Sequence, residues 1–206
     1  MAILRQWYPM DGEGVDLNNL QTSVTITNDP SVPAPRSKLG DRRQGANGSE
    51  WMFVIAGATV TAFNFIAING NFSAQNNTTA VQASGIYTFG VAEFQGISTD
   101  GTSLLNAQPG DYFWACMKAN GGLRINAPST ISVALGAKLY VSQDTPGFLS
   151  TSTTTSTSQF LQIVGVFPAV SATSGSSTGQ GQTNLECGMY TYPYPAVLVS
   201  AQAASV

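Results

Sequence analysis

Short runs of hydrophobic residues, each closed by Gly, Asn, Pro or Ser, follow one another along the chain from Trp51 onward. They are rich in Val, Ile, Phe and Tyr, which is typical of β-strands, and helical spacing is almost absent. The runs are WMFVIA, VTAFNFIAI, GIYTFGVAEF, DYFWACMK, TISVAL, KLYVS and FLQIVGVFPAV. We therefore predict an all-β fold, with a single compact β-barrel or sandwich core over residues 49–170, an extended N-terminal arm and a C-terminal tail.

The two faces of these runs differ from one run to another. In TISVAL, Ile131, Val133 and Leu135 alternate with smaller or polar residues, so we expect a strand with one buried and one wet face. In DYFWACMK (111–118), residues of both parities are apolar. Such a strand lies inside a barrel or is covered by a second subunit.

Two stretches of the core resemble each other. Each begins with Gly-Ala, at Gly57 and Gly136, crosses a polar turn and ends on an apolar strand that contains Gly-Val. A duplicated β motif explains this likeness, and coincidence is the alternative. Because a glycine within an apolar strand usually marks a bulge or a bend, we expect one at Gly90 and one at Gly165.

The predicted N-terminal arm covers residues 1–48. This segment has little hydrophobic periodicity, and it holds four of the ten prolines and five of the eight basic residues. Arg36, Lys38, Arg42 and Arg43 stand within eight positions. The cluster is either a solvated loop or a docking patch for an acidic protein surface, and we take these four residues as candidate interface residues.

The C-terminal segment, 171–206, is predicted to be a polar linker followed by a strap rich in Tyr and Pro. Tyr190, Tyr192 and Tyr194 share one parity, and prolines occupy alternate positions between and after them. Proline cannot donate to a strand ladder, so we expect no central strand here. The three tyrosines either form a docking strap for a shell or a neighbouring subunit or pack on the protein's own core.

The composition argues against an enzyme. Only 9% of the 206 residues are charged, and none is histidine, which removes every catalytic triad that needs an imidazole base. Two carboxylate pairs remain, Asp11/Glu13 and Asp100/Asp111, and both lie in turn contexts that favour aspartate for its geometry. No phosphate-binding, dinucleotide-binding or metal-ligand spacing occurs, so we predict no catalytic residue, no cofactor and no metal.

Charge and hydropathy also limit the partners and the compartment. A net charge of −3 without long basic runs argues against nucleic acid, and no apolar run is long enough to span a membrane. The N-terminus lacks the pattern of a secretory signal, so we expect synthesis in the host cytoplasm. Cys116 and Cys187 could form one bridge, but the apolar surroundings of Cys116 favour a buried, reduced thiol.

Four short motifs, in this order, carry a family resemblance. They are Gly90–Ala92, Gly110–Asp111, the Gly-x-x-Leu-Tyr-x-Ser segment Gly136–Ser142, and Gly165–Val166. With the runs around them, they resemble the small capsid decoration (cement) proteins of tailed bacteriophages. The resemblance covers about 120 positions and leaves out the arm and the tail.

Membership of that family would imply a β-barrel bound in many copies, often as homotrimers, to the exterior of an icosahedral capsid. There the protein would contact the major capsid protein and reinforce contacts between its subunits. The localisation implied is the virion. The alternative function is a head-fibre or spike-type module that binds host surface glycans, for which Trp7 and Tyr8 would be the first aromatic candidates.

Overall fold

The computed structural model describes residues 17, 20–21, 37–45, 48–78, 80–81, 87–94, 106–128, 132–142, 145–151, 159–168, 177–178 and 182–199. Within these residues all the regular elements are β-strands and no helix is formed, which confirms the predicted all-β class. The strands are β1 (Arg42–Gln44), β2 (Glu50–Ala56), β3 (Val60–Thr61), β4 (Phe65–Ile68), β5 (Ser73–Asn76), β6 (Thr88–Val91), β7 (Asn106–Ala107), β8 (Tyr112–Pro128), β9 (Leu139–Val141), β10 (Leu149–Ser150), β11 (Gln159–Pro168), β12 (Ser177–Thr178) and β13 (Gln182–Val199).

Five strands close into a small barrel, which confirms the barrel prediction. Around the ring the order is β2, β5, β4, β6 and β8, and β8 pairs with β2 to complete it. The β2–β5 pair is parallel and the other four pairs are antiparallel. The short β3–β7 pair stands as a separate two-stranded sheet.

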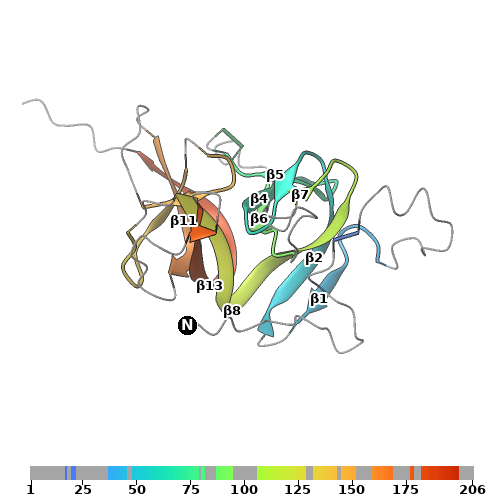
Figure 1. Cartoon of the computed structure of the whole chain (residues 1–206), viewed down its shortest axis with the longest axis horizontal. Helices are drawn as coiled ribbons and strands as arrows, with labels where there is room; N and C mark the ends of the chain where they lie inside the picture. The colour runs from blue at the N-terminus through green and yellow to red at the C-terminus, as the bar shows by residue number, and fades with distance from the viewer. Residues whose placement is uncertain are drawn as a thin grey trace, which may run out of the picture.

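Strand β8 is long enough to serve two sheets. Its first part pairs with β2 up to the rung Glu50↔Lys118, where the register shifts by one residue. From Ala119 to Pro128 it pairs with β13, and the sheet continues through β11 and β9 to β10. Figure 1 shows β8 running from the barrel, on the right, into this second sheet on the left. We call the two halves the barrel and the second lobe.

The core consists of two apolar clusters, one on each face of the barrel strands. Trp114 and Cys116 belong to a cluster that continues into the second lobe, whereas Phe113, Ala115 and Met117 belong to one built from the barrel and the segments around β3 and β7. All five side chains are buried. The prediction that DYFWACMK is covered on both faces is confirmed, and the covering residues come from the same chain.

A turn of the second lobe docks on the barrel. In the loop between β9 and β10, the Gly147 carbonyl accepts a hydrogen bond from the Phe65 amide at 2.7 Å. The Gly147 amide donates to the Asn77 carbonyl, also at 2.7 Å. Gly147 has a φ of +81° and packs against the Asn64 side chain, so the contact requires a residue without a Cβ. The two lobes are therefore fixed to each other at a second place besides β8.

The run TISVAL departs from the prediction. Val133 is buried as expected, but Leu135 lies in a turn and is 67% exposed. The Ala137 amide donates to the Ala134 carbonyl at 3.0 Å, so the chain reverses here before it enters β9. The expected position of Leu135 on the buried face is wrong because the turn at Gly136 cuts the alternation short; Ile131 lies outside the described residues.

The two Gly-Val strands differ in backbone geometry. The register of β11 against β13 shifts between Val164 and Val166, so the expected irregularity at Gly165 is confirmed. Gly90 lies opposite Ile66 in a β4–β6 ladder without a register shift, so no bulge interrupts this pair. The physical reason for Gly90 is space, because a Cβ would lie 2.8 Å from the Cys116 carbonyl oxygen.

The described parts of the N-terminal arm pack on the barrel. Leu17 is fully buried, and Gln21 and Tyr112 exchange two backbone hydrogen bonds of 2.8 Å. Further along, β1 forms an antiparallel pair with β2.

The C-terminal segment contradicts the expectation that it holds no central strand. Residues 182–199 form β13, which lies between β8 and β11 in the sheet. The rungs shared with β8 end at Met189, however, and the half that contains Pro193 and Pro195 pairs only with β11. The expectation that proline excludes a central strand therefore holds for the half of β13 that contains the prolines. The half without proline lies between β8 and β11.

Candidate functional site

The basic candidates from the arm lie on a fixed turn and on β1, while Arg36 lies outside the described residues. In the turn, the Lys38 amide donates to Asp41 Oδ2 at 2.8 Å, and the Asp41 amide donates to the Lys38 carbonyl at 2.9 Å. The Lys38 side chain and Arg42 are exposed, and Arg43 is half-buried opposite Trp51. The structure therefore places three of the predicted interface residues on this turn and on β1, the strand at the edge of the sheet.

The three tyrosines lie on β13 in the second lobe. In the β11–β13 ladder, Val164 pairs with Tyr194 and Val166 pairs with Met189. Residues 190–193 of β13 therefore lie opposite a single residue of β11, Gly165. This segment contains Tyr190 and Tyr192, whose side chains, like that of Tyr194, lie outside what the structure describes. Because β2 and β8 separate β1 from β13 in the sheet, the basic residues and the tyrosines do not share one strand edge.

Most of the candidate catalytic and glycan-binding residues lie outside the residues that the structure describes. These are Asp11, Glu13, Asp100, Trp7 and Tyr8. Asp111 is described and buried, and its carboxylate accepts a hydrogen bond from the Gln108 amide at 2.7 Å. This is the turn role that its sequence context indicated. Among the described residues no three His, Cys, Asp or Glu side chains come together as a metal site.

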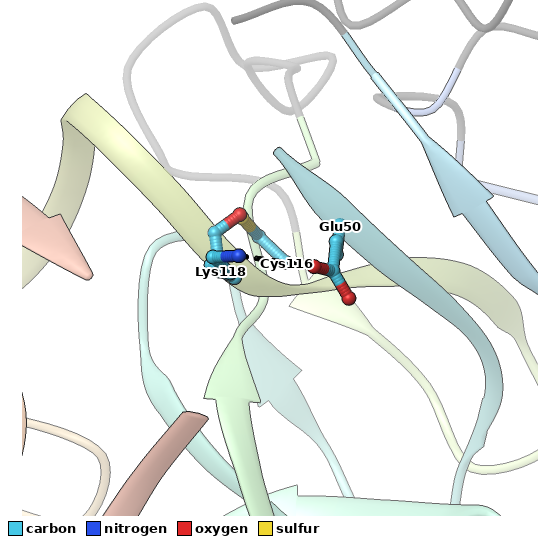
Figure 2. A network of polar contacts seen from close by, with 3 residues as sticks. All are labelled: Glu50, Cys116 and Lys118. Carbon is cyan, nitrogen blue, oxygen red and sulfur yellow. Dashed lines mark hydrogen bonds and ion pairs between the residues drawn. The ribbon is translucent and has the colours of Figure 1, made fainter. Parts of the chain in front are cut away.

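Ionisable side chains gather instead where β8 leaves the barrel (Figure 2). Lys118 Nζ donates to Glu50 Oε1 at 3.2 Å across the last rung of the β2–β8 ladder. The Cys116 thiol points to the Lys118 carbonyl oxygen, with 3.5 Å between Sγ and O. Both side chains of the ion pair are about one-third exposed, so the pair itself contributes only about 0–1 kcal/mol.

The Cys116 thiol is buried and has low reactivity. Its complete burial raises the pKa well above the ordinary value, and the nearby Glu93 carboxylate raises the pKa further. A thiol that stays protonated is a poor nucleophile and a poor metal ligand. Cys187 is buried as well, and neither cysteine forms a disulfide, in agreement with the reduced state favoured by the sequence.

A second cluster, which we call the arginine cluster, consists of Phe63, Glu93 and Arg124. The guanidinium carbon of Arg124 lies 4.1 Å from the centre of the Phe63 ring, and Arg124 Nε lies 3.9 Å from Glu93 Oε1. Burial raises the pKa of the Glu93 carboxyl to about 8, although the charge of Arg124 and a hydrogen bond from its backbone amide act in the opposite direction. Burial thus favours the protonated form of Glu93.

The backbone around Phe63 is held in an unusual conformation. Phe63 has a φ of +66°, which is rare for a large side chain. Its amide donates to the Ala92 carbonyl at 2.7 Å, and its carbonyl accepts from the Asn126 amide at 2.9 Å. Segments from three parts of the chain thus fix the ring that lies under Arg124.

A buried amide network adjoins this cluster. Asn126 Nδ2 donates to the Ala62 carbonyl at 2.8 Å and to Asn64 Oδ1 at 2.7 Å, while Asn64 Nδ2 donates to Asn76 Oδ1 at 3.0 Å. Asn126 Oδ1 is buried and accepts no hydrogen bond from the residues that the structure describes. The network joins β8 and the barrel next to the docked turn at Gly147.

Sequence reasoning did not single out the arginine cluster. Glu93 is the one charged residue in the run GIYTFGVAEF, and Arg124 follows directly on the apolar Leu123. A charged residue within an apolar strand is seldom buried without a partner. These isolated charges in the sequence therefore indicated that Glu93 and Arg124 each have a charged or polar partner.

A comparison of the chain with known protein families, with curated protein sequences and with solved structures finds no match. In the described part of the chain, no helix has the length and apolar character needed to cross a bilayer.

Proposed function

We propose that the protein is a structural component of a tailed-bacteriophage virion, which binds the outside of the icosahedral capsid in many copies. In this role it reinforces contacts between subunits of the major capsid protein. It acts without catalysis, cofactor or metal, and after synthesis in the host cytoplasm it is found on the exterior of the virion.

The observation that carries the proposal is the place of the four matched motifs in the fold. Gly90–Ala92 ends β6, Gly110–Asp111 forms the turn into β8, Gly136–Ser142 contains β9, and Gly165–Val166 lies in β11. All four motifs thus lie in or beside strands and turns of a β-barrel protein, which supports the resemblance. The N-terminal arm and the Tyr-rich tail, which contains β13, lie outside the resemblance.

The turn at Lys38 and the adjoining β1 suit electrostatic docking on an acidic shell. Two hydrogen bonds between Lys38 and Asp41 close the turn, so a partner that meets Lys38 need not order the turn. Exposed ion pairs contribute about 0–1 kcal/mol each, which is weak for one copy. Repeated over a lattice, such contacts stabilise a whole shell through multivalency.

The proposal includes a homotrimer, for which one of the two sequence arguments no longer applies. Apolar faces on both sides of 111–118 suggested a second subunit, but residues of the same chain cover both faces. What supports self-association now is the low content of charged residues, which leaves little repulsion between copies. Analytical ultracentrifugation of the full chain tests this point, and a strictly monomeric mass both free and on the capsid contradicts it.

Cosedimentation of the full chain with purified capsids tests the main proposal. We expect saturable binding at a fixed stoichiometry and a higher temperature of capsid disruption. The double variant K38Q/R42Q should bind about tenfold more weakly at low salt, since two exposed ion pairs are lost, and the difference should shrink as salt rises. K138Q serves as the control, because Lys138 is an exposed cation outside this surface. Absence of capsid binding together with saturable binding to host surface polysaccharide would overturn the proposal in favour of a glycan-binding module.

A further inference from the structure

The turn between β4 and β5 holds an Asn-Gly pair, Asn69-Gly70, in a fixed conformation. The Phe72 amide donates to the Asn69 carbonyl at 3.0 Å, and the Asn69 amide donates to the Ser73 carbonyl at 3.0 Å. The Asn69 side chain is part of the same turn, because its Oδ1 accepts from the Asn71 amide at 2.9 Å and from the Ser73 amide at 3.0 Å. Two backbone donors therefore fix the side-chain carbonyl of Asn69.

This conformation folds the Asn69 side chain over the peptide bond that follows it. The ring closed by the hydrogen bond from the Asn71 amide contains both Asn69 Cγ and the Gly70 nitrogen, and a bond between these two atoms closes a cyclic imide. The two donors on Oδ1 polarise the carbonyl and stabilise the negative charge that develops on this oxygen when a nucleophile adds to Cγ. Asn69 Nδ2, the leaving group in such a reaction, donates to none of the residues that the structure describes.

Gly70 supplies an unhindered nucleophile. The residue is exposed, and a Cβ placed on it would have no neighbour within 4 Å. Its amide donates to no residue in the described part of the chain. Because glycine has no side chain to obstruct the approach of its nitrogen to Cγ, solvent base can reach the amide proton and the nitrogen can reach Asn69.

Three other asparagines lack both of these properties. In each of them the next residue carries a side chain, and the amide of that next residue already donates a hydrogen bond. They are Asn64, Asn71 and Asn76, whose following amides donate to the carbonyls of Gly147, Asn69 and Phe65 respectively. They therefore serve as comparison sites within the same molecule.

We propose that Asn69-Gly70 is a modification site at which the folded protein deamidates spontaneously. Solvent hydroxide removes the Gly70 amide proton, the nitrogen forms a bond to Asn69 Cγ, and the Cγ–Nδ2 bond breaks with release of ammonia. Water then adds to one of the two carbonyl carbons of the imide and reopens the ring. Addition at Cγ gives aspartate, and addition at the main-chain carbonyl carbon gives isoaspartate, whose main chain runs through Cβ and Cγ. The reaction consumes water alone and involves no change of oxidation state.

Phe72 transmits the modification to the N-terminal arm. Phe72 has a φ of +60°, and its carbonyl accepts from the Ile55 amide at 3.1 Å. Its ring packs directly on Gly40, where a Cβ would clash with the ring, and it thus supports the turn that carries Lys38. An aspartate keeps an oxygen for the two backbone donors, whereas an isoaspartate lengthens the main chain of the turn. The isoaspartate form should therefore displace Phe72 and loosen the turn at Lys38.

Peptide mapping of the full chain after incubation at mildly alkaline pH tests the modification. Each event raises a peptide mass by about 1 Da, because NH is replaced by O, and electron-based fragmentation distinguishes isoaspartate from aspartate. We expect Asn69 to react faster than the three comparison asparagines, at a rate that rises with pH. G70A keeps the turn, since a Cβ fits there, and should slow the reaction at Asn69 by at least about tenfold.

Two results would overturn the proposal. One is an intact Asn69 in protein in which any of the three comparison asparagines has reacted. The other is a rate at Asn69 in the native protein more than about tenfold below the rate in urea, because the folded turn would then protect the side chain.

Hydrogen exchange tests the effect on the arm. The modified protein is separated by ion exchange on its added negative charge, and its isoaspartate form should exchange the Gly40 and Asp41 amides faster than the unmodified protein does. N69D is the matched control, because it carries the same charge without a longer main chain, and it should exchange these amides like the unmodified protein. If the isoaspartate form exchanges both amides as slowly as N69D does, the transmission through Phe72 is wrong.

Discussion

Replacement of Gly147 by alanine tests how the second lobe is attached to the barrel. Gly147 has a φ of +81°, and an added Cβ would lie 2.5 Å from Asn64 Nδ2 and 2.7 Å from Asn64 Cγ. The alanine must therefore adopt a left-handed conformation and also displace the Asn64 amide. That amide accepts from Asn126 at 2.7 Å and donates to Asn76 at 3.0 Å, so its displacement disrupts a buried network.

The expected magnitude has two parts. The left-handed conformation costs an alanine about 1–2 kcal/mol. Displacement of Asn64 leaves buried partners without a hydrogen bond, at about 1–3 kcal/mol. The free energy of unfolding of G147A should thus fall by roughly 2–5 kcal/mol, a large share of the stability of an ordinary domain.

Two other glycines separate these contributions. Gly136 has a φ of +72° with open space where a Cβ would stand, so G136A should lose only the conformational part, about 1–2 kcal/mol. Gly70 has neither a positive φ nor a neighbour within 4 Å, so G70A should change stability by less than about 1 kcal/mol. Urea unfolding, with the slope m compared among the variants, measures all three. If G147A and G136A lose the same free energy, the docking contact at Asn64 contributes nothing and our account of the attachment is refuted.

Three further predictions concern buried polar groups. Because the pKa of Glu93 rises from 4.5 in the unfolded chain to about 8 in the folded protein, the folded state binds more protons between these pH values, and its stability should fall by up to a few kcal/mol as pH rises through them. E93Q should remove this slope in urea unfolding measured across pH 5–9, and an unchanged slope would contradict the assignment. Cys116 should resist a thiol reagent in the native protein and react on unfolding, because its burial and raised pKa suppress the thiolate. The reaction is followed by absorbance in the C187S variant, and a rapid reaction of the native protein would show that the site opens. N126A should lose about 1–3 kcal/mol in thermal unfolding, since the Ala62 carbonyl and Asn64 Oδ1 lose a buried donor, and a neutral result would mean that water replaces the amide.

The strand content of the core follows directly from its apolar runs. Residues 112–117 are apolar at both parities, and only a strand covered on both faces accommodates them. Pairing partners do not follow in the same way. The parallel contact of β2 with β5 brings Ile55 opposite Ser73, and nothing in the local pattern of either strand specifies it. Register of this kind depends on the closure of the whole ring.

The errors at the C-terminus and at Leu135 have local physical reasons. Pro193 and Pro195 exclude a neighbour on one edge of their own half of β13. They place no restriction on residues 182–189, which pair with β8 and, from Cys187 on, also with β11. Leu135 is exposed because a turn overrides the alternation of the run that contains it. In the arginine cluster, the approach of Arg124 to Phe63 joins positions 61 residues apart, and a one-dimensional pattern carries no information about such an approach.

The two-sheet span of β8 sets an order of events during synthesis. Its first part needs β2, which lies 65 residues earlier at the rung Trp51↔Cys116, so the barrel can close as soon as β8 has left the ribosome. Its second part needs β13, which begins 54 residues later at the rung Pro128↔Gln182. At common elongation rates of roughly 5–20 residues per second, that half waits for several seconds with unpaired backbone groups along one edge. Non-local pairings of this kind slow folding, and an unpaired apolar edge promotes association between nascent chains. The shared strand that joins the two lobes in the finished protein is therefore also exposed to association with other nascent chains while the chain is being made.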